Sequence, residues 1–192
     1  MNTTSIMIVG VGGQGTLLAS KLLGNVLIAQ GYDVKLSEVH GMSQRGGSVV
    51  TYVRYGDKVY SPIVDQGEAD YILSFEILES ARWISYLKKG GKLLTNTQRT
   101  WPMPVITGAA AYPENIVEKL SEMADVTAVD ALALAEQAGS PKAVNVVLIG
   151  VLSRRMDIPE AAWIKAIEET VPAKFLEMNK KAFELGRQAL DA

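Results

Sequence analysis

Residues 6–9 form a short, fully apolar run, which is the pattern of a strand buried on both faces in a parallel sheet. A glycine-rich loop follows this run, and apolar residues then recur at helical spacing from Leu17 to Val26. Gly31 is expected to end this helix, and residues 33–38 have the pattern of a second strand. Together these segments predict a βαβ unit with a right-handed crossover.

A β-hairpin is expected after the second strand. Residues 48–54 alternate at period two, and Gly56-Asp57 is a turn signal placed directly before the short segment 58–60. The pattern predicts that this hairpin is inserted into an otherwise α/β chain.

The rest of the chain reads as alternating strands and helices, followed by helices alone. Strands are expected at 70–74, 92–95, near 105–107 and at 126–129. Helices are expected at 76–87, where Gly90-Gly91 would end the helix, and at 114–123. After Asp130 we expect four helices, at 131–138, 143–155, 160–170 and 174–190. The pattern predicts a three-layer α/β/α fold with a mostly parallel, Rossmann-like sheet, the inserted hairpin and a helical C-terminal region.

Composition narrows the class of protein. The chain has 192 residues, 48% of them hydrophobic and 21% charged, which is typical of a globular protein and predicts a single domain over 1–192 with a helical part at about 131–192. With 19 basic and 21 acidic residues, no basic excess favours nucleic acid as a partner. The apolar runs are too short for a membrane span, so we expect a cytoplasmic protein without a membrane partner.

The sequence contains no cysteine and one histidine, His40. The chain therefore cannot hold an iron–sulfur cluster through thiolates or act as a thiol nucleophile. With a single imidazole, a zinc site is not expected, and we predict no metal ligands in this chain.

The first glycine loop, residues 10–15, fits the pattern G-x-G-x-x-G between a predicted strand and a predicted helix. Backbone N–H groups in such a loop approach a phosphate closely, and the helix N-terminus favours negative charge. Glu38, at the end of the second strand, is the acidic residue that a ribose would require. The loop could instead serve only a tight turn and close helix–strand packing. The predicted binding residues are Gly10, Gly12, Gly13, Gln14, Gly15, Thr16 and Glu38.

The second glycine loop, residues 40–48, follows the second strand and should lie near the first loop at the carboxyl edge of the sheet, where such folds bind ligands. Arg45 could hold a phosphate or carboxylate through two parallel hydrogen bonds. A solvated loop whose glycines only satisfy turn geometry is the alternative. The predicted ligand-binding residues are Ser43, Gln44, Arg45, Gly46 and Gly47, and His40, Gly41 and Met42 are assigned to a partner-facing or active-site part of the loop.

Two other features are assigned to structure. His40 has no companion residues for a catalytic triad nearby in the sequence, so a structural or interface role is favoured over proton transfer. The helix around Asn145 and Gly150 is expected to serve core or interface packing.

The two loops together, Gly-Val-Gly-Gly-Gln-Gly at 10–15 and Glu-Val-His-Gly-Met-Ser-Gln-Arg-Gly-Gly-Ser at 38–48, carry a resemblance that extends over nearly the whole chain. The sequence resembles the gamma-type subunits or domains of the 2-oxoacid:ferredoxin oxidoreductases. Within that family the run from His40 to Gly47, together with Ser-Pro-Ile at 61–63, is similar to the indolepyruvate branch.

This resemblance implies a subunit of a complex that converts an aryl pyruvate, coenzyme A and oxidised ferredoxin into an aryl-acetyl-CoA, carbon dioxide and reduced ferredoxin. Thiamine diphosphate, Mg²⁺ and [4Fe–4S] clusters would belong to a larger alpha subunit, because this chain lacks cysteine and the Gly-Asp-Gly…Asn run that holds magnesium and thiamine diphosphate. By resemblance, the chain itself carries no catalytic residue and contributes to coenzyme A binding through the two loops. The preferred aryl pyruvate, and whether the isolated chain forms a homodimer, stay open.

Two rival interpretations remain at this stage. One is a self-sufficient NAD- or FAD-dependent oxidoreductase that uses residues 10–15 and Glu38. The other is a structural adaptor, whose glycine loops dock a partner and bind no ligand.

Overall fold

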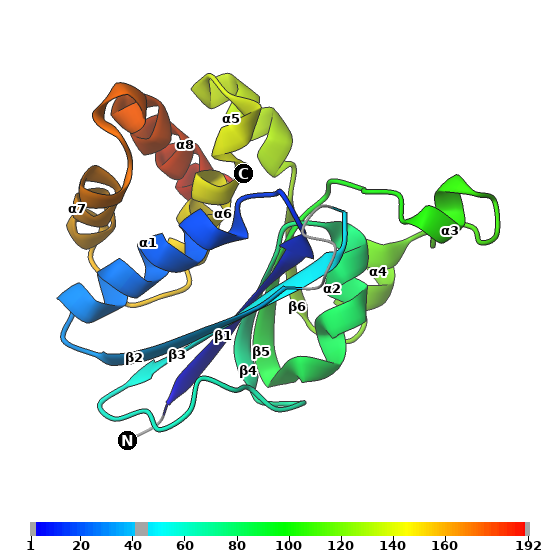
Figure 1. Cartoon of the computed structure of the whole chain (residues 1–192), viewed down its shortest axis with the longest axis horizontal. Helices are drawn as coiled ribbons and strands as arrows, with labels where there is room; N and C mark the ends of the chain where they lie inside the picture. Colours follow the sequence, from blue (N-terminus) through cyan, green and yellow to red (C-terminus); the bar gives the residue numbers. More distant parts are fainter. Residues whose placement is uncertain (1–2, 41–45, 191–192) are drawn as a thin grey trace.

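A computed structural model describes residues 3–40 and 46–190, and within them a six-stranded sheet runs in the order β2-β3-β1-β4-β5-β6 (Figure 1). The strands are β1 Thr4–Val11, β2 Asp33–His40, β3 Ser48–Gly56, β4 Ala69–Ser74, β5 Leu87–Asn96 and β6 Asp125–Val129. Pairs β1/β4, β4/β5 and β5/β6 are parallel, whereas β3 pairs antiparallel with both β1 and β2. The sheet is therefore mostly parallel, as predicted, and β3 alone among these strands runs the other way.

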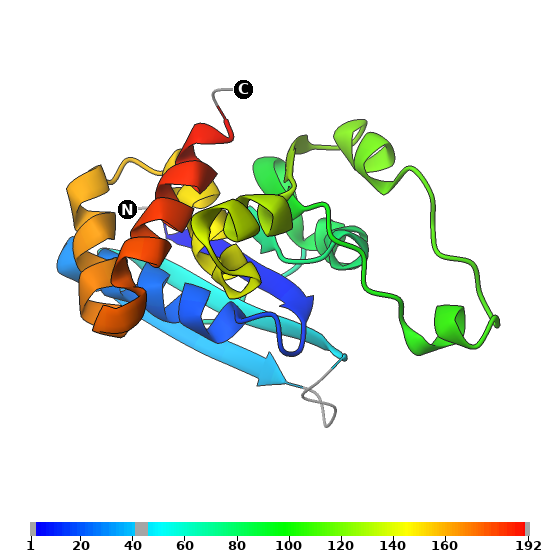
Figure 2. The ribbon, with the colours of Figure 1, turned by 90° about the horizontal axis from the view of Figure 1, so that it is seen from above.

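Helices cover both faces of the sheet (Figures 1 and 2). They are α1 Thr16–Ala29, α2 Ile77–Trp83, α3 Met103–Ile106, α4 Ile116–Ser121, α5 Ala131–Ala138, α6 Val144–Ser153, α7 Glu160–Thr170 and α8 Leu176–Gln188. Because side chains alternate along a strand, β1 sends Ile6 and Ile8 into the core shared with α1 and α5–α8, and Met7 and Val9 into the core shared with α2 and α4. The three-layer prediction is confirmed, and the thicker helical layer is built from α1 together with the helices of the C-terminal part.

The predicted hairpin is in the wrong place. Residues 57–60 form no strand, and the observed hairpin consists of β2 and β3. Both edges of β3 are already paired, one with β1 and one with β2, so no edge is left for residues 58–60. Instead, Val59 is buried and donates its N–H to Asp33 Oδ2 at 2.9 Å.

Gly90 and Gly91 do not stop a helix. α2 ends at Trp83, a short 3-10 helix spans Ile84–Tyr86, and both glycines lie inside β5. A Cβ at Gly91 would lie 2.9 Å from Ala69 O, where the register of β4 against β5 shifts. At Gly91 the neighbouring backbone therefore approaches too closely for a side chain, as happens at a bulge, whereas Gly90 has a φ of 81°, which favours glycine.

The predicted strand near 105–107 is wrong as well. β5 and β6 pair directly, and the chain between them leaves the sheet and forms α3, with Pro104 in its first turn. Proline fits the first turn of a helix because the N–H that it lacks has no partner there.

No helix among residues 3–40 and 46–190 is long and apolar enough to cross a membrane.

The helices of the C-terminal half pack on one another, and Trp163 of α7 stacks on Phe183 of α8 with ring centroids 6.2 Å apart. α6 is buried along its whole length between α8 and the sheet, as its apolar sequence predicts.

Candidate functional site

The first glycine loop lies at the carboxyl edge of the sheet, between β1 and α1. Gly13 and Gly15 have φ values of 101° and 86°, in the left-handed region that favours glycine. A Cβ at Gly10 would lie 2.9 Å from Phe75 Cβ, and one at Gly15 would lie 2.7 Å from Asn145 Nδ2. Backbone conformation and close packing therefore both require glycine here.

The loop is held in shape by its own polar groups. Gln14 Oε1 accepts the N–H of Val11 at 2.8 Å, and Gln14 Nε2 donates to Phe75 O at 3.3 Å. Asn145 Nδ2 donates to Gly15 O at 3.3 Å, across 130 positions of sequence. Gln14 therefore uses both ends of its amide inside the protein, and Asn145, assigned to packing from the sequence, also supports the loop.

The first turn of α1 contains no acidic residue. Gly15 is the N-cap residue, and no side chain of the described residues caps the helix with a hydrogen bond. Thr16, the first helical residue, is buried. The first N–H groups of a 14-residue helix carry partial positive charge and are suited to an anion.

A cleft of about 580 Å³ opens beside this helix end. Its lining residues come from the glycine loop, α1, the segment after β5, the start of α5, the 3-10 helix Pro141–Ala143 and the start of α6. They are Gly13, Gln14, Gly15, Leu18, Gln98, Leu132, Pro141, Lys142, Val144 and Asn145. Among the residues that the structure describes, Lys142 is the one charged side chain in this lining, and it is exposed. Sequence reasoning missed Gln98 and Lys142, which belong to no motif and reach the cleft only through the fold.

The second loop lies partly outside the described residues, which exclude Gly41, Met42, Ser43, Gln44 and Arg45. Its C-terminal end is described and lies against the first loop. Gly12 donates its N–H to Gly47 O at 2.8 Å, and Gly46 donates its N–H to Gly12 O at 3.3 Å. The prediction that the two loops meet at one edge of the sheet is confirmed for Gly46 and Gly47. The backbone of His40, at the end of β2, pairs with Val49 of β3.

Glu38 is not placed as a dinucleotide fold would place it. In that fold the acidic residue ends the strand next to the first one, whereas here β3 lies between β1 and β2. Glu38 accepts a hydrogen bond from Ser20 Oγ of α1 at 3.1 Å. This arrangement gives the NAD or FAD interpretation no structural support.

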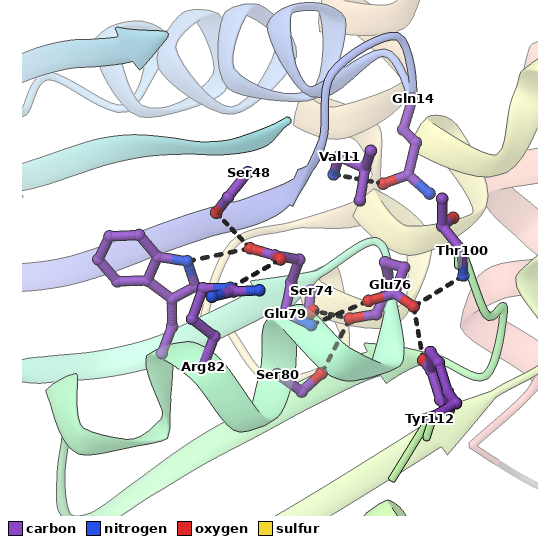
Figure 3. Close-up of polar contacts among 11 residues, drawn as sticks. Val11, Gln14, Ser48, Ser74, Glu76, Glu79, Ser80, Arg82, Thr100 and Tyr112 are labelled. Carbon is purple, nitrogen blue, oxygen red and sulfur yellow. Dashed lines mark hydrogen bonds and ion pairs between the residues drawn. The ribbon is translucent and has the colours of Figure 1, made fainter. Parts of the chain in front are cut away.

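Helix α2 supplies two buried carboxylates beneath the loops (Figure 3). Glu79 accepts hydrogen bonds from Arg82 Nε at 2.9 Å and Trp83 Nε1 at 3.3 Å, and from the hydroxyl of Ser48, the last residue of the second loop. Glu76 is the N-cap of α2 and accepts the N–H of Glu79 at 2.9 Å. The second loop is thus anchored to α2 at its C-terminal end.

Comparison with known proteins decides the family. Residues 5–189 match the family model described as "Pyruvate ferredoxin/flavodoxin oxidoreductase". The chain belongs to this family. It is 46% identical to indolepyruvate oxidoreductase subunit IorB of Pyrococcus horikoshii, over 98% of this chain and 96% of that protein. The resemblance seen in the sequence is thereby confirmed, including the similarity to the indolepyruvate branch.

Two solved structures show the same fold. The gamma subunit of a keto/oxoacid ferredoxin oxidoreductase from Geobacter sulfurreducens has a TM-score of 0.73 and 26% identity, covering 98% of this chain and 99% of that one. The 2-oxoglutarate:ferredoxin oxidoreductase of Magnetococcus marinus has a TM-score of 0.77 and 17% identity, covering 100% of this chain and 31% of that one. The same fold thus occurs both as a separate subunit and as part of a longer chain.

Proposed function

We propose that this chain is the small subunit of an indolepyruvate-type 2-oxoacid:ferredoxin oxidoreductase and that its cleft binds the phosphate groups of coenzyme A. The observation that carries the proposal is the cleft itself, in which an uncapped helix N-terminus and Lys142 lie beside the first glycine loop. A helix N-terminus and a lysine together supply the N–H donors and the positive charge that phosphates require.

Open space at Gly13 supports this use of the loop. A Cβ built at Gly13 would meet no atom within 4 Å, so this side of the loop faces open space. Gly10 and Gly15, by contrast, face Phe75 and Asn145 closely and hold the loop in place. The loop therefore has one packed side and one open side, which a phosphate can approach without displacing protein atoms.

The second loop is proposed to complete the binding site. Gly46 and Gly47 hold its end against Gly12, so the loop begins and ends at the edge where the cleft opens. We assign Ser43, Gln44 and Arg45 to coenzyme A phosphates on the same sequence argument as before. His40, Gly41 and Met42 are assigned to the part of the loop that faces the partner subunit or the active site.

The redox and carbanion chemistry is proposed to lie on a larger partner. The chain contains no cysteine, and no group of three or more His, Cys, Asp or Glu side chains in the described part could hold a metal ion. We therefore assign thiamine diphosphate, Mg²⁺ and the [4Fe–4S] clusters to the alpha subunit, which would also deliver electrons to ferredoxin. When bound there, thiamine diphosphate supplies the nucleophile and electron sink for decarboxylation.

Lys142→Ala is expected to raise the KM for coenzyme A about tenfold in the assembled complex and to leave the KM for indolepyruvate unchanged. Removing one charge-assisted hydrogen bond costs about 1.5 kcal/mol, which is roughly tenfold in affinity. The measurement is steady-state reduction of ferredoxin or a viologen at varied coenzyme A.

The matched control is Lys58→Ala, because Lys58 is also exposed but follows β3 at the opposite edge of the sheet. An unchanged coenzyme A KM in the Lys142 variant would contradict the proposal. Altered assembly together with an unchanged KM would favour the structural adaptor.

A further inference from the structure

Residues 97–113, here called the arm, leave the sheet after β5 and project beyond α2, with α3 at their far end (Figures 1 and 2). The arm begins at the same carboxyl edge as the cleft. Its first residues are part of the site, because Gln98 lines the cleft and accepts the N–H of Ile77 through its backbone oxygen at 3.1 Å.

The surface of the arm is apolar and exposed. Trp101, Met103 and Ile106 have exposed fractions of 59%, 66% and 61%. Between Thr100 and Pro113 the sequence contains no charged residue, although 21% of the whole chain is charged. Clustered apolar side chains without charge are typical of the centre of a protein–protein interface, and tryptophan is prominent among residues that dominate binding.

The arm is fixed at both ends by one buried carboxylate (Figure 3). Glu76 Oε1 accepts the N–H of Thr100 at 2.9 Å and the hydroxyl of Tyr112 at 2.8 Å. Burial and the Glu76 hydrogen bond raise the pKa of Tyr112, so its hydroxyl remains a donor. Arg99 lies 5.6 Å above the Tyr112 ring. Because the ends are already ordered, docking the arm requires less loss of conformational entropy.

We infer that the arm is the docking element for the larger, thiamine-carrying subunit and that it inserts Trp101, Met103 and Ile106 into an uncharged, apolar groove on that subunit. The inference rests on the proposed function. Coenzyme A held in the cleft must meet a reaction centre that this chain lacks, so the subunit that holds that centre approaches at this edge. The arm projects from the wall of the cleft at the carboxyl edge of the sheet. It therefore lies where the approaching large subunit makes contact.

The test compares two methionines of similar exposure. Met103 lies on the arm, whereas Met123, with an exposed fraction of 71%, lies before β6 at the opposite edge of the sheet. The full chain, as wild type, Met103→Arg and Met123→Arg, is titrated against the purified large subunit without coenzyme A, and the Kd is measured by interferometry. We expect Met103→Arg to raise the Kd at least tenfold and Met123→Arg to change it less than twofold.

Trp101→Ala is a second test variant, because it removes an apolar ring without introducing a charge. We expect it to raise the Kd for the large subunit at least tenfold as well. Equal effects at Met103 and Met123, or no effect of Met103→Arg and Trp101→Ala, would overturn the inference. So would a result in which Met103→Arg disrupts only self-association of the isolated chain, since the arm would then bind a second copy. A wild-type chain that fails to bind the large subunit would overturn the proposed function as well, whereas failure at Lys142 alone leaves the arm result intact.

Discussion

Gly186→Ala is expected to destabilise the protein by about 3 kcal/mol, because α6 and α8 touch through their backbones. A Cβ at Gly186 would lie 2.0 Å from Val147 O, and a Cβ at Gly150 would lie 2.2 Å from Phe183 O. At each glycine, the backbone of the facing helix thus occupies the space that a side chain would need. An added methyl group must push the helices apart, and the core that α6 shares with the sheet would lose its packing. Urea unfolding of the isolated chain measures the change.

The control is Gly24→Ala, which is also a glycine inside a helix. A Cβ at Gly24 in α1 would meet no atom within 4 Å, so alanine fits there. Alanine is the better helix former by about 0.5–1 kcal/mol, and this variant should be slightly more stable than wild type. If Gly186→Ala unfolds at the same urea concentration as Gly24→Ala, the close contact of α6 with α8 is not present in solution.

Glu76→Ala is the second large effect, with an expected loss of about 3 kcal/mol. The carboxylate is 1% exposed and accepts the N–H groups of Thr100 and Glu79 and the hydroxyl of Tyr112. Removing it leaves these donors without their acceptor, and an unsatisfied buried donor costs about 1–3 kcal/mol. The variant also releases both ends of the arm.

Two measurements separate these consequences. Thermal or urea unfolding reports the stability, and the rate of trypsin cleavage after the exposed Arg99 reports the freedom of the arm. Glu136→Ala, at an exposed position of α5, should change stability by less than about 0.5 kcal/mol and leave cleavage unchanged. Tyr112→Phe removes a single hydroxyl and should speed cleavage with a smaller loss of stability. Slow cleavage in Glu76→Ala would show that the arm is held by other contacts.

The local sequence pattern is enough to predict a strand or helix when that element is defined by its own residues. Strands were predicted at β1, β2, β4 and β6, and α7 was predicted at its observed ends, because apolar period and glycine or proline punctuation act over a few residues. The same reasoning failed for residues 58–60 and 105–107. Whether an extended segment becomes a strand depends on a free neighbouring edge, and β3 and β5 are already paired on both sides.

The candidate site likewise contains some residues that the local sequence identifies and others that it does not. The first glycine loop was found from the sequence, since its spacing follows from the backbone geometry of one turn. Gln98, Lys142 and Asn145 were not found as site residues, because nothing local marks them and they meet the loop only across the sheet edge.

The α/β class, the glycine loop and the family can be read from the sequence, because periodicity, turn residues and motif spacing depend on residues that are close together in the chain. The tertiary structure alone decided that β3 separates Glu38 from the first loop, that Lys142 faces it, and that Glu76 holds an apolar arm beside the cleft. These relations join residues that are distant in the chain. They are set by which strand edges pair and which buried groups find partners, and the local pattern does not specify either.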